Sequence, residues 1–386
     1  MAAPLRVLYL DHAPQLGGAE RSLLDLIGRL DRREFLPLVA LPGPGPLGEA
    51  LLAQGVEVLR LPLVWIRPGR GIAALVAGLI GSLRASLALL ALLGRERVDI
   101  VHANGTQALL NVWAAALLSR RPFIWQLRDL PERPLPTRLL GLLCHRVVCI
   151  SEAVRERFVA LAPGFPVSRL RVIHPGVEVP EPDPAARARL REILGLVEEL
   201  PLVGMCAQMV PWKRHELFLE MARVIATREA RTHFVLIGDD PFHASALRRR
   251  LEAGVRAAGL DARIHFTGWR EDAPELLAGL DLLVHPTCRE PFGRSVAEAL
   301  VRGVPVVAVA GGGAAEILKG SGAGLLVPPE DAGALAEAVC ALLQDSGRRA
   351  QMAAAGPRHM ARRFPAAEGA LMISQLYREL PPCASA

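Results

Sequence analysis

Three features are scarce in this chain of 386 residues: aromatic side chains, lysines and closely spaced cysteines. Aromatic residues make up 4% of the chain and hydrophobic residues 51%, so the cores are built from Leu, Val and Ala, which favours α/β layers over an aromatic-rich β-sandwich. The six cysteines form no C-x-x-C pair and show no metal-ligand spacing, which is typical of reduced thiols in a cytosolic protein. No D-x-D triplet occurs, so the sequence offers no obvious carboxylate pair for a metal ion between substrate phosphates.

Charge and the N-terminal residues narrow the class further. The formal net charge is +6, but no Lys/Arg tract with interleaved aromatics appears, so nucleic acid is not the expected partner. An acidic ligand or an anionic membrane surface fits the positive charge better. The apolar run at the N-terminus is too short for a signal peptide and predicts a first strand.

One hydrophobic run is unusually long. Ile72–Leu93 is almost entirely apolar and is long enough to span a bilayer, although Arg84 near its centre would be costly there. Because the run lies where a helix is needed between two predicted strands, we favour a buried crossover helix. A membrane-spanning helix stays open, and so does an amphipathic helix on a membrane surface with arginines at its ends (Arg67, Arg70, Arg95 and Arg97).

Short apolar runs alternate with helical stretches in two successive series. The expected strands are 6–10, 35–41, 56–61, 99–102, 123–127, 146–150 and 170–173, then 202–207, 233–238, 263–267, 282–285, 305–309 and 325–327. A proline-rich linker, residues 176–186, separates the two series. The pattern predicts an α/β protein with two doubly wound, Rossmann-like domains facing a cleft. We expect an N-terminal domain over 1–180, a C-terminal domain over 181–360 and a last helical segment over 361–386.

The most informative segment is R-E-P-F-G-R-S-V-A-E-A-L, residues 289–300, which carries Glu290 and Glu298. It follows an apolar run, and α/β proteins bind ligands at the carboxyl ends of such strands. A proline and a glycine place Glu290 on a loop, so the helix begins near Arg294 and Glu298 lies about one turn inside it. Two such carboxylates can accept hydrogen bonds from two parts of one polyhydroxyl ligand. A helix with an N-terminal acid and a solvated glutamate is the alternative.

Two glycine-rich loops also follow predicted strands. Gly17 and Gly18 stand directly before a helix, where backbone N–H groups can approach a phosphate, although a plain flexible loop has the same composition. Residues 310–316 contain three consecutive glycines, which predict a loop whose backbone can contact a ligand closely.

Three other side chains mark strand ends. Lys213 is one of only two lysines in the chain, and its compact ammonium suits a single phosphate oxygen; a surface position without a role is the alternative. His102 and Arg128 end strands of the first series and could face the same cleft. For His102, a hydrogen-bonded structural histidine is equally open.

Together these segments resemble the family 4 retaining glycosyltransferases, which have the GT-B fold. The match runs from about Val7 to Val339 and is most specific in the second series, where the carboxylate pair corresponds to the family's E-x7-E signature. The other matching segments include A-Q-M-V-P-W-K-R, G-W-R-E-D-A-P-E-L-L, G-V-P-V-V-A, G-L-L-V-P-P, G-G-A-E, I-S-E-A-V and V-I-H-P-G-V-E. The resemblance implies that the final helix crosses back onto the first domain.

The resemblance also assigns roles by position. It implies that Glu290 contacts the hydroxyls of the donor sugar and Glu298 the ribose of the nucleotide. Lys213 would hold the donor diphosphate, helped by N–H groups near Gly17 and Gly18. Donor binding is also expected of Gln208, Phe292, Gly293 and Arg294. Family members need no essential metal, which agrees with the missing D-x-D, so no cofactor and no metal are expected.

Some positions depart from the family pattern. Five residues before Lys213, Gln208 stands where the family usually has a phosphate-binding arginine. Glutamine carries no charge, so more of the stabilisation of the leaving group would fall to Lys213. The common His-Asp pair is Arg128-Asp129, which would bring a charge toward an anionic acceptor or the phosphate. We therefore expect Arg128 to act in catalysis with Glu290 and Lys213.

We predict a retaining, metal-independent glycosyltransferase that moves a hexose from a UDP- or GDP-linked donor to a lipid-linked or polysaccharide acceptor. The expected location is the cytoplasm, with a peripheral position on the inner face of the cell membrane as the finer expectation. A GT-B epimerase or hydrolase that consumes the donor without an acceptor stays open. A non-catalytic, membrane-associated assembly partner also stays open, because Gln208 weakens the phosphate site and Ile72–Leu93 is so apolar.

Overall fold

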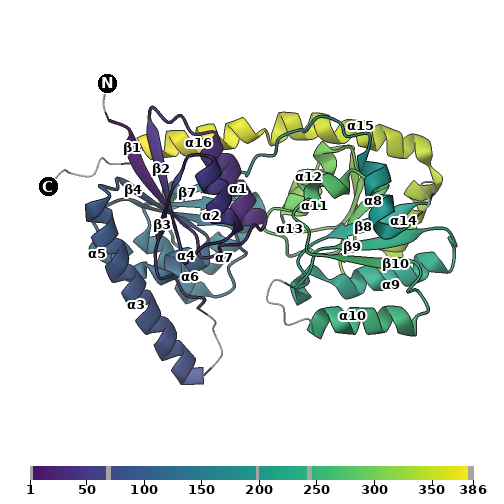
Figure 1. Ribbon diagram of the computed structural model, residues 1–386, viewed down its shortest axis with the longest axis horizontal. Helices are drawn as coiled ribbons and strands as arrows, with labels where there is room; N and C mark the ends of the chain where they lie inside the picture. Colours follow the sequence, from purple (N-terminus) through teal and green to yellow (C-terminus); the bar gives the residue numbers. More distant parts are fainter. Residues whose placement is uncertain (1–2, 67–70, 197–199, 241–245, 381–386) are drawn as a thin grey trace. The chain divides into compact units, whose positions relative to one another are not determined.

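The computed structural model describes residues 3–66, 71–196, 200–240 and 246–380, and it divides into two compact units. Unit 1 comprises residues 1–176 and 366–386, and unit 2 comprises residues 177–365. Each unit contains one parallel sheet with helices packed around it (Figure 1). The α/β fold class with two doubly wound sheets, expected from the sequence, is confirmed.

Unit 1 contains a seven-stranded parallel sheet in the order β3-β2-β1-β4-β5-β6-β7. Its strands are β1 (Leu5–Leu10), β2 (Phe35–Leu41), β3 (Glu57–Arg60), β4 (Ile100–Asn104), β5 (Phe123–Leu127), β6 (Arg146–Cys149) and β7 (Leu170–Val172). Its helices are α1 (Gly18–Gly28), α2 (Pro46–Ala53), α3 (Gly71–Arg95), α4 (Thr106–Asn111), α5 (Trp113–Leu118), α6 (Pro134–Leu143), α7 (Glu152–Leu161), η1 (Val167–Arg169) and the C-terminal α16 (Ala366–Arg378). Strand order reverses between β1 and β4, so right-handed crossovers place α1 and α2 on the opposite face from α3 to α7.

Unit 2 repeats this plan with six parallel strands in the order β10-β9-β8-β11-β12-β13. Its strands are β8 (Leu202–Cys206), β9 (His233–Ile237), β10 (Ile264–Gly268), β11 (Leu282–His285), β12 (Val306–Val309) and β13 (Gly324–Val327). Its helices are α8 (Ala186–Leu194), η2 (Pro211–Lys213), α9 (His215–Ala226), α10 (Ala246–Ala257), α11 (Ala273–Leu277), α12 (Arg294–Val301), α13 (Gly312–Leu318), α14 (Ala332–Gln344) and α15 (Ser346–Arg363). Here the strand order reverses between β8 and β11.

Local chemistry explains why the expected elements form where they do. All thirteen predicted strands are present, and their ends lie within two residues of the expected ones. The Ser151 hydroxyl accepts a hydrogen bond from the Val154 N–H and caps α7, as expected for a serine before a helical run. Gly293 has φ of 103°, a left-handed conformation that glycine adopts easily, and α12 begins at Arg294 as predicted.

Helix α3 differs from the favoured expectation of a buried crossover helix. It connects β3 to β4, and its second half is buried through side chains such as Leu89 and Leu92. Its first half is exposed, however: Ile72 retains 82% of its surface and Leu75 retains 70%. Within the described residues, α3 is the single helix long and apolar enough, by length and composition, to cross a membrane. The buried expectation is therefore wrong for the first half, and Arg67 and Arg70 lie outside the described residues.

A buried ion pair anchors the start of β11, the strand that leads to Glu290. The Arg191 guanidinium donates to the Gly279 carbonyl at 2.7 Å and to Asp281 Oδ2 at 2.9 Å. Asp281 Oδ2 also accepts from the Leu202 N–H at the start of β8. The Arg191 side chain is 2% exposed, so its charge depends on these partners. The pair ties α8 to the two central strands of unit 2.

Replacement of Asp281 tests this anchor. Asp281→Ala leaves the Arg191 charge buried without its carboxylate, and we expect a loss of about 3–5 kcal/mol in the free energy of unfolding. The matched control is Asp272→Ala, which breaks an exposed Asp–Arg pair and should cost less than about 1 kcal/mol. Urea denaturation of both variants measures the difference, and equal losses would contradict the anchoring role.

Candidate active site

In each unit, the candidate residues gather where the strand order reverses. Doubly wound sheets bind ligands at this point, beyond the carboxyl ends of the two central strands. In unit 2 these strands are β8, which leads to Lys213 in η2, and β11, which leads to the loop carrying Glu290. In unit 1 they are β1 and β4, which lead to Asp11 and end at Asn104.

Lys213 and Glu290 are bonded to each other. Lys213 Nζ lies 2.5 Å from Glu290 Oε2, and the two side chains are 14% and 9% exposed. His285 Nε2, at the end of β11, lies 3.3 Å from the same carboxylate oxygen. The Lys213 ammonium also lies 4.2 Å from the centre of the Trp212 ring, a cation–π contact. The structure thus brings together two residues that the sequence placed on separate loops.

The charge state of Glu290 follows from these neighbours. Burial alone raises the pKa of the carboxyl, but the Lys213 charge and the adjacent His285 outweigh burial and lower the pKa to about 2. Glu290 is therefore ionised at neutral pH. An ionised carboxylate accepts hydrogen bonds and attracts positive charge, and it cannot serve as a general acid.

The triple-glycine loop supports Glu290 from behind. The Gly313 N–H donates to the Glu290 carbonyl at 2.8 Å. A Cβ on Gly313 would meet the Phe292 backbone at 2.5 Å, and one on Gly312 would meet the Glu290 carbonyl at the same distance. The glycines therefore allow two loops to pack backbone against backbone. The sequence predicted close approach to a ligand here, but in the structure these glycines closely approach the protein's own chain.

The remaining donor-binding candidates of unit 2 occupy two environments. Glu298 is 7% exposed and pairs with Arg294 at 2.7 Å, one turn earlier on α12, so the alternative of a solvated glutamate is wrong. Phe292 is buried and its ring packs edge-on against Phe364 at 6.0 Å. Gln208 is partly buried and follows β8 by two residues.

An open pocket of about 530 Å³ lies beside the Lys213–Glu290 pair. Its volume falls in the range of about 300–1,000 Å³ that is usual for small-molecule sites. It is lined by Pro211, Trp212, Arg214, Thr287, Cys288, Arg289 and Glu330. Arg214 and Glu330 form an ion pair, and the Thr287 hydroxyl donates to the Trp212 carbonyl. Charged, aromatic and hydroxyl groups thus line a pocket next to the Lys213–Glu290 pair.

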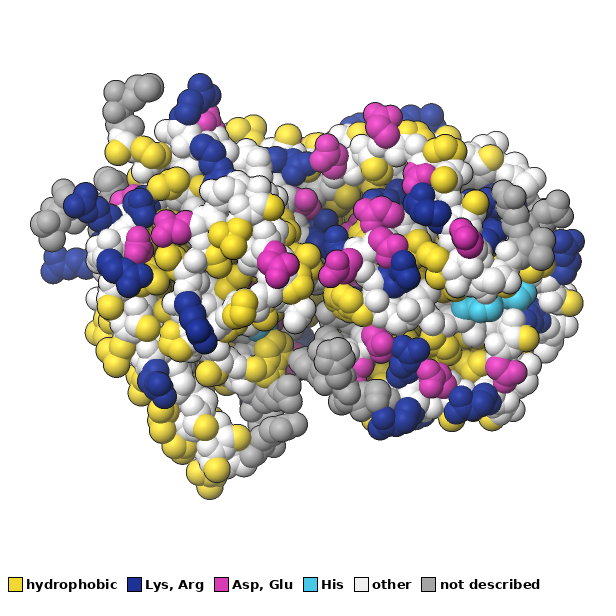
Figure 2. Space-filling model, in the orientation of Figure 1, with side chains coloured by type: hydrophobic (Ala, Val, Ile, Leu, Met, Phe, Trp, Pro, Cys, Tyr) yellow, Lys and Arg dark blue, Asp and Glu magenta, His cyan; other side chains and the backbone are white. Residues whose placement is uncertain are grey.

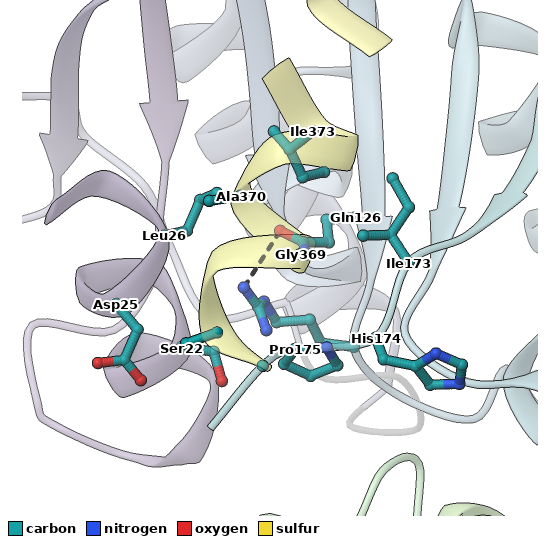
Figure 3. A pocket seen from close by; sticks show the side chains of 13 residues that line it. Ser22, Asp25, Leu26, Gln126, Ile173, His174, Pro175, Gly369, Ala370 and Ile373 are labelled. Atoms are coloured by element: carbon teal, nitrogen blue, oxygen red, sulfur yellow. Dashed lines mark hydrogen bonds between the residues drawn. The ribbon is translucent and has the colours of Figure 1, made fainter. Parts of the chain in front are cut away.

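In unit 1, Arg128 belongs to a chain of polar contacts along the carboxyl edge of the sheet. Its Nε donates to Asn104 Oδ1 at 2.5 Å and its Nη2 to Gln126 Oε1 at 3.1 Å. The Asn104 amide in turn donates to Asp11 Oδ2 at 2.5 Å. Arg128, Gln126 and His174 also line a cavity of about 30 Å³ against α16, with room for about one water molecule (Figure 3).

His102 contacts one member of this series of polar contacts, Gln126, and is fully buried. One ring nitrogen bonds the Tyr377 hydroxyl of α16 at 2.7 Å and the other bonds Gln126 at 3.1 Å. The Tyr377 hydroxyl also bonds Tyr9 at 2.7 Å. Burial, and then the charge of Arg128, lower the pKa of His102 to about 3, so the ring is neutral. Of the two possibilities for His102, the structural one is right.

The Gly17–Gly18 turn begins α1, but its first N–H group is already occupied. The Gly17 N–H donates to Glu20 Oε2 at 3.0 Å, so a carboxylate sits where the sequence predicted a phosphate. Burial raises the pKa of Glu20, and burial followed by the nearby Glu20 raises that of Asp11 to about 8. Asp11 is therefore largely protonated at neutral pH and offsets little of the Arg128 charge.

Sequence reasoning missed Asp11, Asn104, Glu20 and His285. Asp11, Asn104 and His285 end or directly follow the central strands, so the strand-end rule that selected Glu290 would also have selected them. Glu20 had no comparable signal, because a glutamate in a first helical turn is common. Among the described residues, no group of three or more His, Cys, Asp or Glu side chains could hold a metal ion. The five described cysteines are free, and Cys383 lies outside the described residues.

Comparisons with known proteins agree with this geometry. A family model described as Glycosyltransferase Family 4 matches residues 16–180, and one described as Glycosyl transferases group 1 matches residues 200–345. The chain is 30% identical over 371 residues to the GDP-mannose-dependent alpha-(1-6)-phosphatidylinositol monomannoside mannosyltransferase of Mycolicibacterium smegmatis, which covers 91% of this chain and 92% of the relative. It is also 30% identical over 374 residues to the 2-deoxystreptamine N-acetyl-D-glucosaminyltransferase of Streptomyces fradiae, covering 89% and 86% of the two chains.

A solved structure extends the comparison to the whole fold. HepE of Anabaena, solved in complex with UDP-glucose, matches with a TM-score of 0.84 and 26% sequence identity. The match covers 97% of this chain and 100% of HepE. The structural neighbours are GT-B glycosyltransferases, so the GT-B fold expected from the sequence is confirmed.

The ion pair at Glu290 predicts a specific dependence of stability on pH. The unfolded carboxyl takes up its proton near pH 4.5 and the folded one only near pH 2, so the free energy of unfolding falls as pH drops between these values, by at most about 1.4 kcal/mol per unit. Lys213→Met removes the ammonium and should flatten that fall. Chemical denaturation between pH 3 and 6 measures it. The control is Lys319→Met at the chain's other lysine, which is exposed; identical profiles for Lys213→Met and the unmodified protein would contradict the pairing.

Proposed function

The chain belongs to the family 4 glycosyltransferases, and we propose that it transfers a hexose from a nucleotide-sugar to a glycan or lipid-linked acceptor with retention of configuration. The observation that carries this proposal is the buried Lys213–Glu290 pair at the reversal point of the second sheet. Cation and carboxylate stand side by side there, as needed to hold a diphosphate and a sugar from one ligand. The relatives found are transferases, which favours transfer over an epimerase or a hydrolase.

In this proposal, donor binding exchanges the partners of the ion pair. The Lys213 ammonium turns from Glu290 to the donor diphosphate, and the Glu290 carboxylate turns to the sugar hydroxyls. Breaking the sugar–phosphate bond builds negative charge on the diphosphate. A positioned cation stabilises that charge, and such a donor is often worth about 3–4 kcal/mol. Gln208 brings no charge, so Lys213 carries most of this stabilisation.

The depressed pKa of Glu290 supports a role as acceptor and not as acid. Since the carboxylate is ionised at neutral pH, it can fix the sugar hydroxyls and favour positive charge at the anomeric carbon. The departing phosphate oxygen then takes the proton of the acceptor hydroxyl on the same face, which gives retention. No metal or cofactor enters the proposal. Phe292, Gly293, Arg294 and Glu298 shape the nucleotide side, with Glu298 leaving Arg294 for the ribose.

Arg128 serves the acceptor side in this proposal. Two neutral amides, Asn104 and Gln126, hold its guanidinium, and burial raises the pKa of Asp11 and Glu20 nearby. With a pKa of about 8, Asp11 is largely protonated at neutral pH and offsets little of the Arg128 charge, which suits a phosphate on a lipid-linked acceptor or on the donor. The N–H groups of the Gly17–Gly18 turn can assist only if Glu20 moves away from Gly17.

Relatives guide the choice of donor and location. A mycobacterial relative is named for GDP-mannose and a phosphatidylinositol mannoside, and HepE was solved with UDP-glucose. We propose a UDP- or GDP-linked hexose as donor and a lipid-linked acceptor. We further propose that the protein acts in the cytoplasm, peripherally on the inner face of the cell membrane.

A donor screen tests the proposed function directly. We expect one UDP- or GDP-linked hexose to raise the melting temperature, because a ligand that binds the folded state stabilises it by RT ln(1 + [L]/Kd). Incubation of that donor with and without a lipid-linked acceptor, followed by product analysis, then measures transfer. Full consumption of the donor without acceptor would indicate an epimerase or hydrolase. Failure of both UDP and GDP to bind in calorimetry would indicate a non-catalytic partner.

Variants of the two glutamates separate their roles. Glu290→Gln and Lys213→Ala should each lower turnover at least tenfold, about 1.4 kcal/mol of barrier, while the protein stays folded. Glu298→Gln should mainly weaken nucleotide binding, with a smaller effect on turnover. Steady-state kinetics with calorimetric nucleotide titrations measures both quantities. Near-normal turnover in Glu290→Gln and Lys213→Ala would overturn the site assignment.

A further inference from the structure

Helix α3 packs in the reverse of the usual orientation for a helix of a water-soluble unit. As far as Leu87, its large apolar side chains face solvent: Ile72, Leu75, Val76, Leu79, Ile80, Leu83 and Leu87 are between 40% and 82% exposed. At 100° per residue these seven positions fall within an arc of about 140° on one side of the helix. Figure 2 shows the resulting apolar ridge along α3, and Figure 1 shows its first turns extending beyond the rest of unit 1.

Before Leu89, the opposite side of α3 is made of small residues. Gly78, Gly81, Ser82 and Ala85 face the protein, and a Cβ on Gly81 would meet a Val64 methyl at 2.8 Å. As far as Leu87, the helix therefore contributes small groups to the unit and leaves its large apolar groups outside, whereas Leu89, Leu92 and Leu93 near its end are buried. A ridge of this size on a soluble monomer marks a surface that another apolar body covers.

We propose that the exposed ridge of α3 inserts into one leaflet of an anionic lipid bilayer and holds the protein on the membrane surface. Residues 71–81, which precede the first buried residue of α3, Ser82, span about 17 Å as a helix. A bilayer core is about 30 Å thick, so this part is too short to cross it. The helix therefore lies in the interface or dips into it, as amphipathic anchors do.

Charge favours an anionic lipid surface as the occupant. The sequence contains five arginines and no acidic residue between Glu57 and Glu96. Arg84 is exposed and lies about 40° beyond one edge of the ridge, where its guanidinium can reach lipid phosphates. Trp65, which is 48% exposed, precedes the helix, and its ring lies tilted against that of His12 with the ring centres 4.8 Å apart; tryptophan concentrates at membrane interfaces.

The ridge is fixed close to the candidate acceptor edge of unit 1. α3 follows β3, so it begins at the carboxyl edge of the sheet, the same edge that carries Arg128. Asn111 of α4 bonds the Val64 N–H and carbonyl at 2.7 and 2.8 Å, and Gln107 does the same for Ile66 at 3.2 and 2.9 Å. These amides set the path of the chain into α3. A lipid-linked acceptor would thus meet Arg128 at the membrane; this last step rests on the proposed function.

Vesicle sedimentation with the full chain tests the inference. Leu75→Ser/Leu79→Ser should weaken partitioning onto phosphatidylglycerol–phosphatidylcholine vesicles at least tenfold. The matched control, Leu52→Ser/Leu371→Ser, replaces two leucines of similar exposure on α2 and α16 and should bind as the unmodified protein does. Arg84→Glu should lower binding to these vesicles and leave the weaker binding to pure phosphatidylcholine unchanged.

Two measurements keep this test separate from the proposed function. Vesicle binding is measured without nucleotide, and nucleotide binding of the α3 variant is measured without vesicles and should be normal. Light scattering of the protein without lipid reports the alternative occupant, a second copy of the chain. A dimer that Leu75→Ser/Leu79→Ser splits, together with absent vesicle binding, would overturn the proposal, and so would equal vesicle binding by the α3 and control variants.

Discussion

The buried contact between Lys213 and Glu290 is the interaction on which the candidate site of unit 2 depends. Each group alone would be costly to keep away from water, and together they hold the loops after two neighbouring strands in one place. The glycines behind Glu290 serve the same end, because they let its loop pack without intervening side chains. In the proposed function, the two charges become available to the donor together: its phosphate replaces Glu290 as the partner of Lys213, and its hydroxyls replace Lys213 as the partners of Glu290.

Unit 1 arranges its charge differently at the corresponding point of its sheet. Arg128 is held by amides, and burial raises the pKa of the nearby Asp11 to about 8, so this carboxyl is largely protonated at neutral pH. Unit 2 thus neutralises its cation with a carboxylate, whereas unit 1 preserves positive charge. The Tyr9–Tyr377–His102 contacts link this edge to α16, so the C-terminal helix helps to fix where Gln126, and through it Arg128, can lie.

Local signals explain what the sequence could predict. Strands, the loop position of Glu290 and the start of α12 follow from short-range patterns of apolar residues, proline and glycine. The Asn104–Asp11 contact joins residues 93 positions apart and depends on which strands become neighbours, so no local pattern announces it. Glycines 311–313 could equally have faced a ligand or another loop, since both need the same absence of a side chain. Gly17 was assigned to phosphate because the competing Glu20 carboxylate is visible only in three dimensions.

Helix α3 shows the limit of hydropathy as a guide to burial. An apolar run shows that a segment avoids water, but a protein core and a lipid leaflet both exclude water. The distinguishing feature is which side of the helix carries the large residues, and that requires knowing which side faces the unit. Between Ile72 and Leu87, small groups face the unit and large apolar groups face outward, which is the basis for proposing an apolar partner outside the unit. If the acceptor is lipid-linked, as we propose, confinement to the membrane surface also raises the effective concentration of that acceptor. The proposed anchor beside Arg128 would then increase productive encounters without any added contact to the substrate.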